Sequence, residues 1–278
     1  SLTMDLIVLF VCTVVFAISA YSGLDKGIKW LSNVNLGLLT IMLLFVLVFG
    51  PTLFIFKTGT NSLGIVIENF FRMNTYTDPV GQSGFPEKWT IFYWAWWIVY
   101  APFMGLFVAK ISEGRTLKQM IIGSVLYGTL GCALVFIILG NFAMYLEINN
   151  IVPLIDILNK HGAPAAIMAM LGSLPLPKFI TTIFTLTAII FLSTTFDSSS
   201  YSLAAVTQSK VVNDPEKWNR LFWAFALAIL PVALMLIGGL KALQTASIIV
   251  ALPIILVMII MSISFVKMVK RDRKKKTF

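Results

Sequence analysis

Aromatic residues are concentrated between positions 89 and 100, in the stretch WTIFYWAWWIVY. With about 3.6 residues per helical turn, Tyr93, Trp96 or Trp97, and Tyr100 fall on one face, so a single helix would present a wall of aromatic rings. Quaternary ammonium groups cannot donate hydrogen bonds, and ring quadrupoles hold them with about 0.5 to 2 kcal/mol per face. The stretch therefore predicts a cage for a methylated ammonium cation.

The alternative is an aromatic belt, because Trp and Tyr gather at membrane interfaces. Trp89 fits such a belt. The residues from Trp94 to Tyr100 lie roughly 8 to 17 Å further along a helix, which places them beyond it. Composition alone leaves cage and ordinary packing as open alternatives.

A second stretch, FLSTTFDSSS at 191–200, sets hydroxyls and the carboxylate of Asp197 inside an otherwise apolar run. Such groups cost several kcal/mol when they face lipid, so we expect them to face a protein or water-filled interior. Hydroxyl and carbonyl oxygens suit a hard cation such as Na⁺. The structural alternative is that the hydroxyls bond to their own helix and that Asp197 caps a helix end.

Composition identifies the class of protein. The 278 residues are 58% hydrophobic and 12% charged, and the mean hydropathy is +0.91. Because soluble domains carry about a quarter charged residues, this indicates an integral membrane protein. The formal charge of +9 lies in short loops and a terminal cluster, which argues against a nucleic-acid partner. His161 has no second metal ligand at a suitable spacing, so neither an enzyme nor a metal centre is expected.

Continuous apolar runs predict an all-α fold with seven membrane-spanning helices, because each span needs about 20 apolar residues. A short amphipathic helix is expected at 61–73 and a pair of helices on the outer face at 151–171. The predicted spans are 2–22, 32–56, 89–110, 118–146, 178–206, 220–240 and 243–267.

The distribution of Lys and Arg predicts the orientation. The basic tail from Lys267 to Lys276 and the larger share of the basic loop residues fall on one side, which the positive-inside bias makes cytoplasmic. We therefore expect the carboxy terminus inside and the amino terminus of this chain outside. The basic tail either adheres to anionic membrane lipid or only enforces this orientation.

Four segments resemble the betaine/carnitine/choline transporter family. They are WTIFYWAWWIVYAPFMGLFVAKISEGRT (89–116), SGLDKGIKWLSNVNL (22–36), GPTLFI (50–55) and GGLKALQTASIIVALP (238–253). The resemblance implies a leucine-transporter-like fold of inverted repeats, of which this chain matches the sixth to twelfth spans, with the first part missing. It implies the last two helices of repeat one at 1–57, an outer segment at 58–88, repeat two at 89–267 and a cytoplasmic tail at 268–278.

The resemblance also implies substrate-binding residues. Trp96 and Trp97 match aromatic residues that line the family's central cage, and Phe92 and Tyr100 match positions along the path toward the cytoplasm. Trp94 belongs to the same motif.

The coupling ion follows from the same resemblance. Phe191, Thr194 and Thr195 match positions that supply a carbonyl and two hydroxyls to one Na⁺ in sodium-coupled members. Met104 and Tyr100 instead resemble the sodium-independent carnitine exchangers.

The expected function is secondary transport of a trimethylammonium solute such as glycine betaine, coupled to Na⁺, in the plasma membrane. The family implies a homotrimer, and no cofactor beyond the coupling ion is expected. The alternatives are a sodium-independent carnitine or betaine exchanger and a truncated fragment that does not transport.

Overall fold

The computed structural model describes residues 2–22, 27–209, 214–237 and 240–275, and these ranges contain helices without any strand. The expected all-α fold is confirmed for them. The helices are α1 (Leu2–Ser22), α2 (Lys29–Phe49), α3 (Thr52–Glu68), α4 (Phe70–Thr75), π-helix η2 (Pro86–Ile91), α5 (Phe92–Ile111), α6 (Leu117–Val135), π-helix η3 (Phe136–Gly140), α7 (Asn141–Ile148), α8 (Leu154–His161), α9 (Ala163–Gly172), α10 (Pro177–Val206), α11 (Lys217–Ile237) and α12 (Leu240–Lys275).

Several of these helices are long and apolar enough to cross a membrane. Within the described ranges five segments qualify by length and composition: Lys29–Phe49, Pro86–Ile111, Leu117–Ile148, Pro177–Val206 and Gln244–Asp272. Helices α1 and α11 have 21 residues each, and their crossing, like the total of seven spans, stays a prediction.

The prediction of one helix over 32–56 is wrong. Helix α2 ends at Phe49, and α3 begins at Thr52 after an extended Gly50 with φ −91° and ψ −173°. Pro51 causes the break, because proline has no N–H for the helical ladder and disfavours helical geometry in the residue before it. A Cβ on residue 50 would also collide with the carbonyl oxygen of Val46.

The amphipathic segment expected at 61–73 is the end of α3 followed by α4, with the break at Asn69. The division expected after residue 57 falls inside α3, so no helix boundary marks it. The helix pair expected at 151–171 is confirmed as α8 and α9, which meet at Gly162 with φ +83°. Helix α8 begins where the backbone N–H of Ile155 donates to Oε2 of Glu147 at 3.1 Å.

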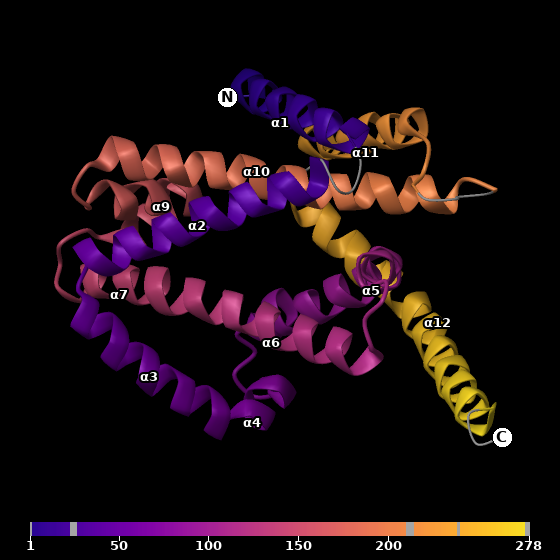
Figure 1. Cartoon of the computed structure of the whole chain (residues 1–278). Helices are drawn as coiled ribbons and strands as arrows, with labels where there is room; N and C mark the ends of the chain where they lie inside the picture. Colours follow the sequence, from indigo (N-terminus) through magenta and orange to yellow (C-terminus); the bar gives the residue numbers. More distant parts are fainter. Residues whose placement is uncertain (1, 23–26, 210–213, 238–239, 276–278) are drawn as a thin grey trace.

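Helix α10 is the centre of the described fold. It packs against α1, α2, α5, α9 and α11 (Figure 1). The largest apolar core joins α2, α7, α9 and one half of α10, with Val46, Leu171 and Ile180 fully buried. Helix α12 packs against α5 and then extends away from the other helices toward the carboxy terminus (Figure 1).

Candidate functional site

The aromatic wall is formed by η2 and α5, which follow one another without a break. The rings of Trp89 and Tyr93 stack at 6.0 Å and 10°. Phe92 meets Trp96 edge to face at 5.8 Å, and Trp97 meets Tyr100 in the same way at 6.3 Å. Because each pair is three or four residues apart, helical geometry alone brings the rings into contact.

The rings border several hollows on the surface of α5, of which two adjoining ones contain Trp96 or Trp97 in their lining. One, of about 530 Å³, is lined by Lys88, Trp89, Phe92, Tyr93, Trp96 and Gln244. The other, of about 370 Å³, is lined by Met73, Asn74, Trp89, Thr90, Tyr93, Trp94 and Trp97. Adjacent helical residues diverge by about 100°, so Trp96 and Trp97 face different hollows while Tyr93 borders both.

The predicted cage residues are open on one side. Trp97 keeps 61% of its surface exposed, Trp94 57% and Trp96 37%. The described residues therefore supply one wall of aromatic rings. This wall would cover one side of a bound cation and leave its other side open.

Tyr100 and Met104 lie further along α5, away from the two hollows. Tyr100 contacts the ring of Phe103 and lies close to Ser199 of α10. Met104 packs against a buried cluster of Ile28, Phe107 and Tyr201. The structure thus places these two predicted substrate residues along the contact between α5 and α10.

The predicted sodium ligands meet on one turn of α10. The hydroxyls of Thr194 and Thr195 donate to the carbonyl oxygen of Phe191 at 2.8 Å and 3.2 Å. A hydroxyl that donates its proton keeps its lone pairs, so both oxygens can still face a cation. The described part of the chain has no group of three His, Cys, Asp or Glu side chains that could hold a metal ion.

Three serines of this stretch also bond to their own helix. Ser193 donates to the carbonyl of Ile189, Ser198 to that of Thr194 and Ser200 to that of Asp197. This is the structural alternative, and it holds for these serines and equally for Thr194 and Thr195, whose hydroxyls bond to a carbonyl of the same helix. Asp197 is no cap, because α10 continues to Val206 and the carboxylate is fully buried.

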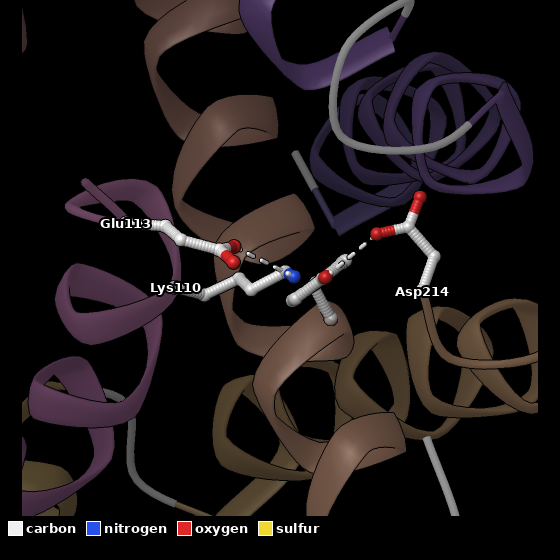
Figure 2. Close-up of polar contacts among 4 residues, drawn as sticks. Lys110, Glu113 and Asp214 are labelled. Atoms are coloured by element: carbon white, nitrogen blue, oxygen red, sulfur yellow. Dashed lines mark hydrogen bonds and ion pairs between the residues drawn. The ribbon is translucent and has the colours of Figure 1, made fainter. Parts of the chain in front are cut away.

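The end of α5 is joined to α10 and to the segment before α11. Phe107 meets Tyr201 edge to face at 6.2 Å, and the Tyr201 hydroxyl donates to Oδ1 of Asp214 at 2.8 Å. Figure 2 shows Asp214 and, in the same view, the pair in which Lys110 donates to Glu113 at 3.3 Å. Because that pair is exposed, it adds little stability, and the buried rings make the main contact.

Sequence reasoning missed a turn that leads into the aromatic wall. Both carboxylate oxygens of Asp78 accept hydrogen bonds: from the Tyr76 hydroxyl at 2.9 Å, from the Gly81 N–H at 3.0 Å and from the Ser83 N–H at 2.9 Å. Asp78 itself has φ +47°, which Asp tolerates better than most residues. The spacing of Asp, Gly and Ser before Pro86 is the signal that identifies such a turn.

We expect Asp78→Asn to loosen this turn. The hydrogen bonds from Ser83, Tyr76 and Gly81 hold the pKa of the Asp78 carboxyl group below its ordinary value. Because the pKa of Asp78 is lower in the folded than in the unfolded chain, the ionised carboxylate stabilises the turn at pH values above the unfolded-state pKa. This stabilisation is lost as the pH falls through the folded-state pKa. Chymotryptic cleavage after Tyr76 or Phe85 should be roughly fivefold faster in Asp78→Asn at neutral pH.

The exposed Glu87→Gln is the matched control, because Glu87 loses a charge in the same segment without such contacts. At a pH below the folded-state pKa of Asp78, with pepsin as the acid-active protease, the unmodified chain should approach the cleavage rate of Asp78→Asn. Equal rates for the unmodified chain and Asp78→Asn at neutral pH would contradict this role.

Comparison with known proteins decides the family. The model of the betaine/carnitine/choline family transporters matches residues 1–274. The chain belongs to this family. A carnitine transporter of Acinetobacter baumannii is 35% identical over 272 residues, which are 97% of this chain and 50% of that protein. An ectoine/hydroxyectoine transporter of Virgibacillus pantothenticus is 34% identical over 265 residues, 95% of this chain and 52% of that protein. An uncharacterised transporter of Escherichia coli strain K12 is 32% identical over 262 residues, which are 93% of this chain and 54% of that protein.

Membership in the betaine/carnitine/choline transporter family makes the chain a multi-pass membrane protein of the transporter class, not an enzyme. The chain spans about half the length of the curated relatives it matches. The activity of a whole carrier is therefore a proposal for this chain.

Proposed function

We propose that the chain forms the cation-binding wall and the sodium position of a secondary transporter for a trimethylammonium solute such as glycine betaine. The observation that carries the proposal is the series of ring contacts on η2 and α5, together with the placement of Trp96 and Trp97 beside open hollows. Desolvated rings attract a methylated ammonium group with about 2 kcal/mol per face, whereas water solvates that group weakly.

Na⁺ is the proposed coupling ion. Three oxygens, from Phe191, Thr194 and Thr195, gather on one turn of α10, and α10 packs against α5. An ion held there sits on the helix that contacts the aromatic helix, so its positive charge can favour a solute carboxylate nearby.

The exchanger is the second candidate. Met104 and Tyr100 resemble the sodium-independent branch, and both lie on the contact between α5 and α10.

The third candidate is a chain that does not transport, because a wall that covers only one side of a cation cannot fully desolvate it.

We further propose that the gene product lies in the plasma membrane with the carboxy terminus cytoplasmic and the amino terminus of this chain outside, and that it forms a homotrimer. The excess of basic residues on the tail side supports the orientation. The exposed apolar residues of α3 and α4, including Ile67 and Phe71, leave a surface for a second copy.

Uptake of labelled glycine betaine by cells that express the gene product tests the function. We expect accumulation when Na⁺ is present and little when K⁺ replaces it. Uptake that is equal in both media but stimulated by internal carnitine would identify the exchanger. Residues 1–278 expressed alone test the third candidate, since micromolar betaine binding by this chain would rule it out.

A further inference from the structure

A buried polar junction lies where α1, α10 and α11 meet. Asp197 of α10 has no exposed surface, Arg220 of α11 is 3% exposed, and Ser19 of α1 is 7% exposed. The neighbours of the Asp197 carboxyl group are the Ser19 side chain, the Arg220 guanidinium and the backbone of Ala20. Three helices therefore direct polar groups into one interior space.

An apolar layer bounds this junction. Phe16 of α1 stacks on Phe196 of α10 at 5.1 Å and 15°. Ala20, Ala224 and Ala228 complete the same buried cluster. Ser19 and Asp197 lie within one turn of these rings, and Arg220 lies one turn before Ala224, so the polar groups are enclosed rather than open to lipid.

Several donor and acceptor atoms of this junction form no hydrogen bond with any described residue. Ser19 Oγ, both carboxylate oxygens of Asp197, and Nε and Nη1 of Arg220 are buried and have no hydrogen-bond partner. In particular, neither oxygen of Asp197 accepts a hydrogen bond from Arg220 directly. Buried polar atoms without partners are rare in folded proteins, and an ordered water commonly satisfies them.

We propose that Ser19, Asp197 and Arg220 enclose one or more water molecules that connect the carboxylate to the guanidinium. The opposite charges of Asp197 and Arg220 favour water over an ion between them. A cation would face the guanidinium and an anion would face the carboxylate, whereas water accepts from Nε and Nη1 and donates to Oδ1 and Oδ2. Buried water makes about three hydrogen bonds, which this set of atoms provides.

The water-bridged pair fixes how α1 and α11 sit on α10. The neighbouring layer consists largely of alanines and two rings, which pack without fixing one exact position along the helix axes. A carboxylate and a guanidinium that must share water fix that position, because a shift by one turn would leave both charges buried and unpaired. This role depends on neither the proposed solute nor the proposed coupling ion.

A double-mutant cycle tests the pair in the detergent-solubilised gene product. Asp197→Asn and Arg220→Gln each leave one buried charge alone, so each should lower the midpoint of thermal unfolding by roughly 10 °C. The double variant should recover most of this loss. Asp156→Asn and Arg115→Gln change exposed residues and are the matched controls. Losses that simply add in the double variant would overturn the proposal.

The water itself is tested by hydroxyl-radical footprinting of unmodified protein, in which X-rays ionise bound water and label the side chains beside it. Phe16 is 1% exposed and should be labelled although bulk solvent does not reach it. Labelling should disappear in the apolar double variant Asp197→Leu with Arg220→Met. An unlabelled Phe16 would overturn the water site. A thermal stability that rises with Na⁺ in the unmodified protein but not in Asp197→Asn would also overturn it and would indicate a bound cation instead.

Discussion

Trp97→Leu should reduce the affinity for a trimethylammonium solute by about 30-fold, which corresponds to the loss of about 2 kcal/mol from one desolvated ring face. Trp97 borders the hollow that it shares with Trp94 and Tyr93, and it also supports the ring of Tyr100. Leu keeps the apolar surface but has no ring quadrupole. The measurement is the concentration dependence of labelled betaine uptake, with surface expression determined in parallel.

Two further variants separate cation binding from folding. Trp97→Phe keeps a ring and should retain part of the affinity, whereas a purely steric role would make Phe as harmful as Leu. Trp30→Leu removes an exposed tryptophan on α2 and should leave uptake unchanged. Equal uptake by Trp97→Leu and the unmodified protein would exclude Trp97 from the cage.

Removal of both hydroxyls of the oxygen cluster, by Thr194→Ala with Thr195→Ala, should weaken Na⁺ binding, so that uptake requires a higher Na⁺ concentration. Two of the three oxygens that gather at the Phe191 carbonyl are lost, and a weakly held cation does not tolerate the loss of two ligands. We expect the Na⁺ concentration for half-maximal uptake to rise at least roughly tenfold, equivalent to about 1.4 kcal/mol. Uptake measured across a Na⁺ series at constant ionic strength provides the test.

The same helix offers a matched control. Thr181 and Thr182 are also adjacent, and their hydroxyls bond to the carbonyls of Pro177 and Lys178 in the same way. Thr181→Ala with Thr182→Ala removes the same atoms from α10 and should leave the Na⁺ dependence unchanged. If both pairs shift it equally, the effect comes from the helix and the proposed sodium position is excluded.

The presence of a helix could be predicted from the sequence where the pattern of apolar and polar residues alone determines it. Long apolar runs determine α10 and α12, and the polar interruptions determine the pair α8 and α9. The break after Phe49 was missed because a search for apolar residues passes over Gly50 and Pro51, although proline geometry identifies it. Chain composition therefore predicts spans better than their ends.

The candidate site could be predicted in part. The spacing of Phe92 and Trp96 predicts their contact, because both lie on one helix. Helical geometry also predicts that Trp96 and Trp97 face different directions, but the other walls of the two hollows, Met73 and Asn74 of α4 and Gln244 of α12, come from tertiary packing. Likewise, sequence showed Asp197 to be a polar residue in an apolar run, but its proximity to Ser19 and Arg220 arises from the packing of three helices.

The length of helix α10 amplifies any tilt of this helix into a larger displacement of its ends. Its 30 residues make it about 45 Å long, and the oxygen cluster begins at its midpoint and extends toward the end where Tyr201 contacts Phe107. A tilt of about 5° around the midpoint displaces each tip by about 2 Å in opposite directions. A rigid helix of this length therefore converts a small rotation at its centre into displacements at both of its ends.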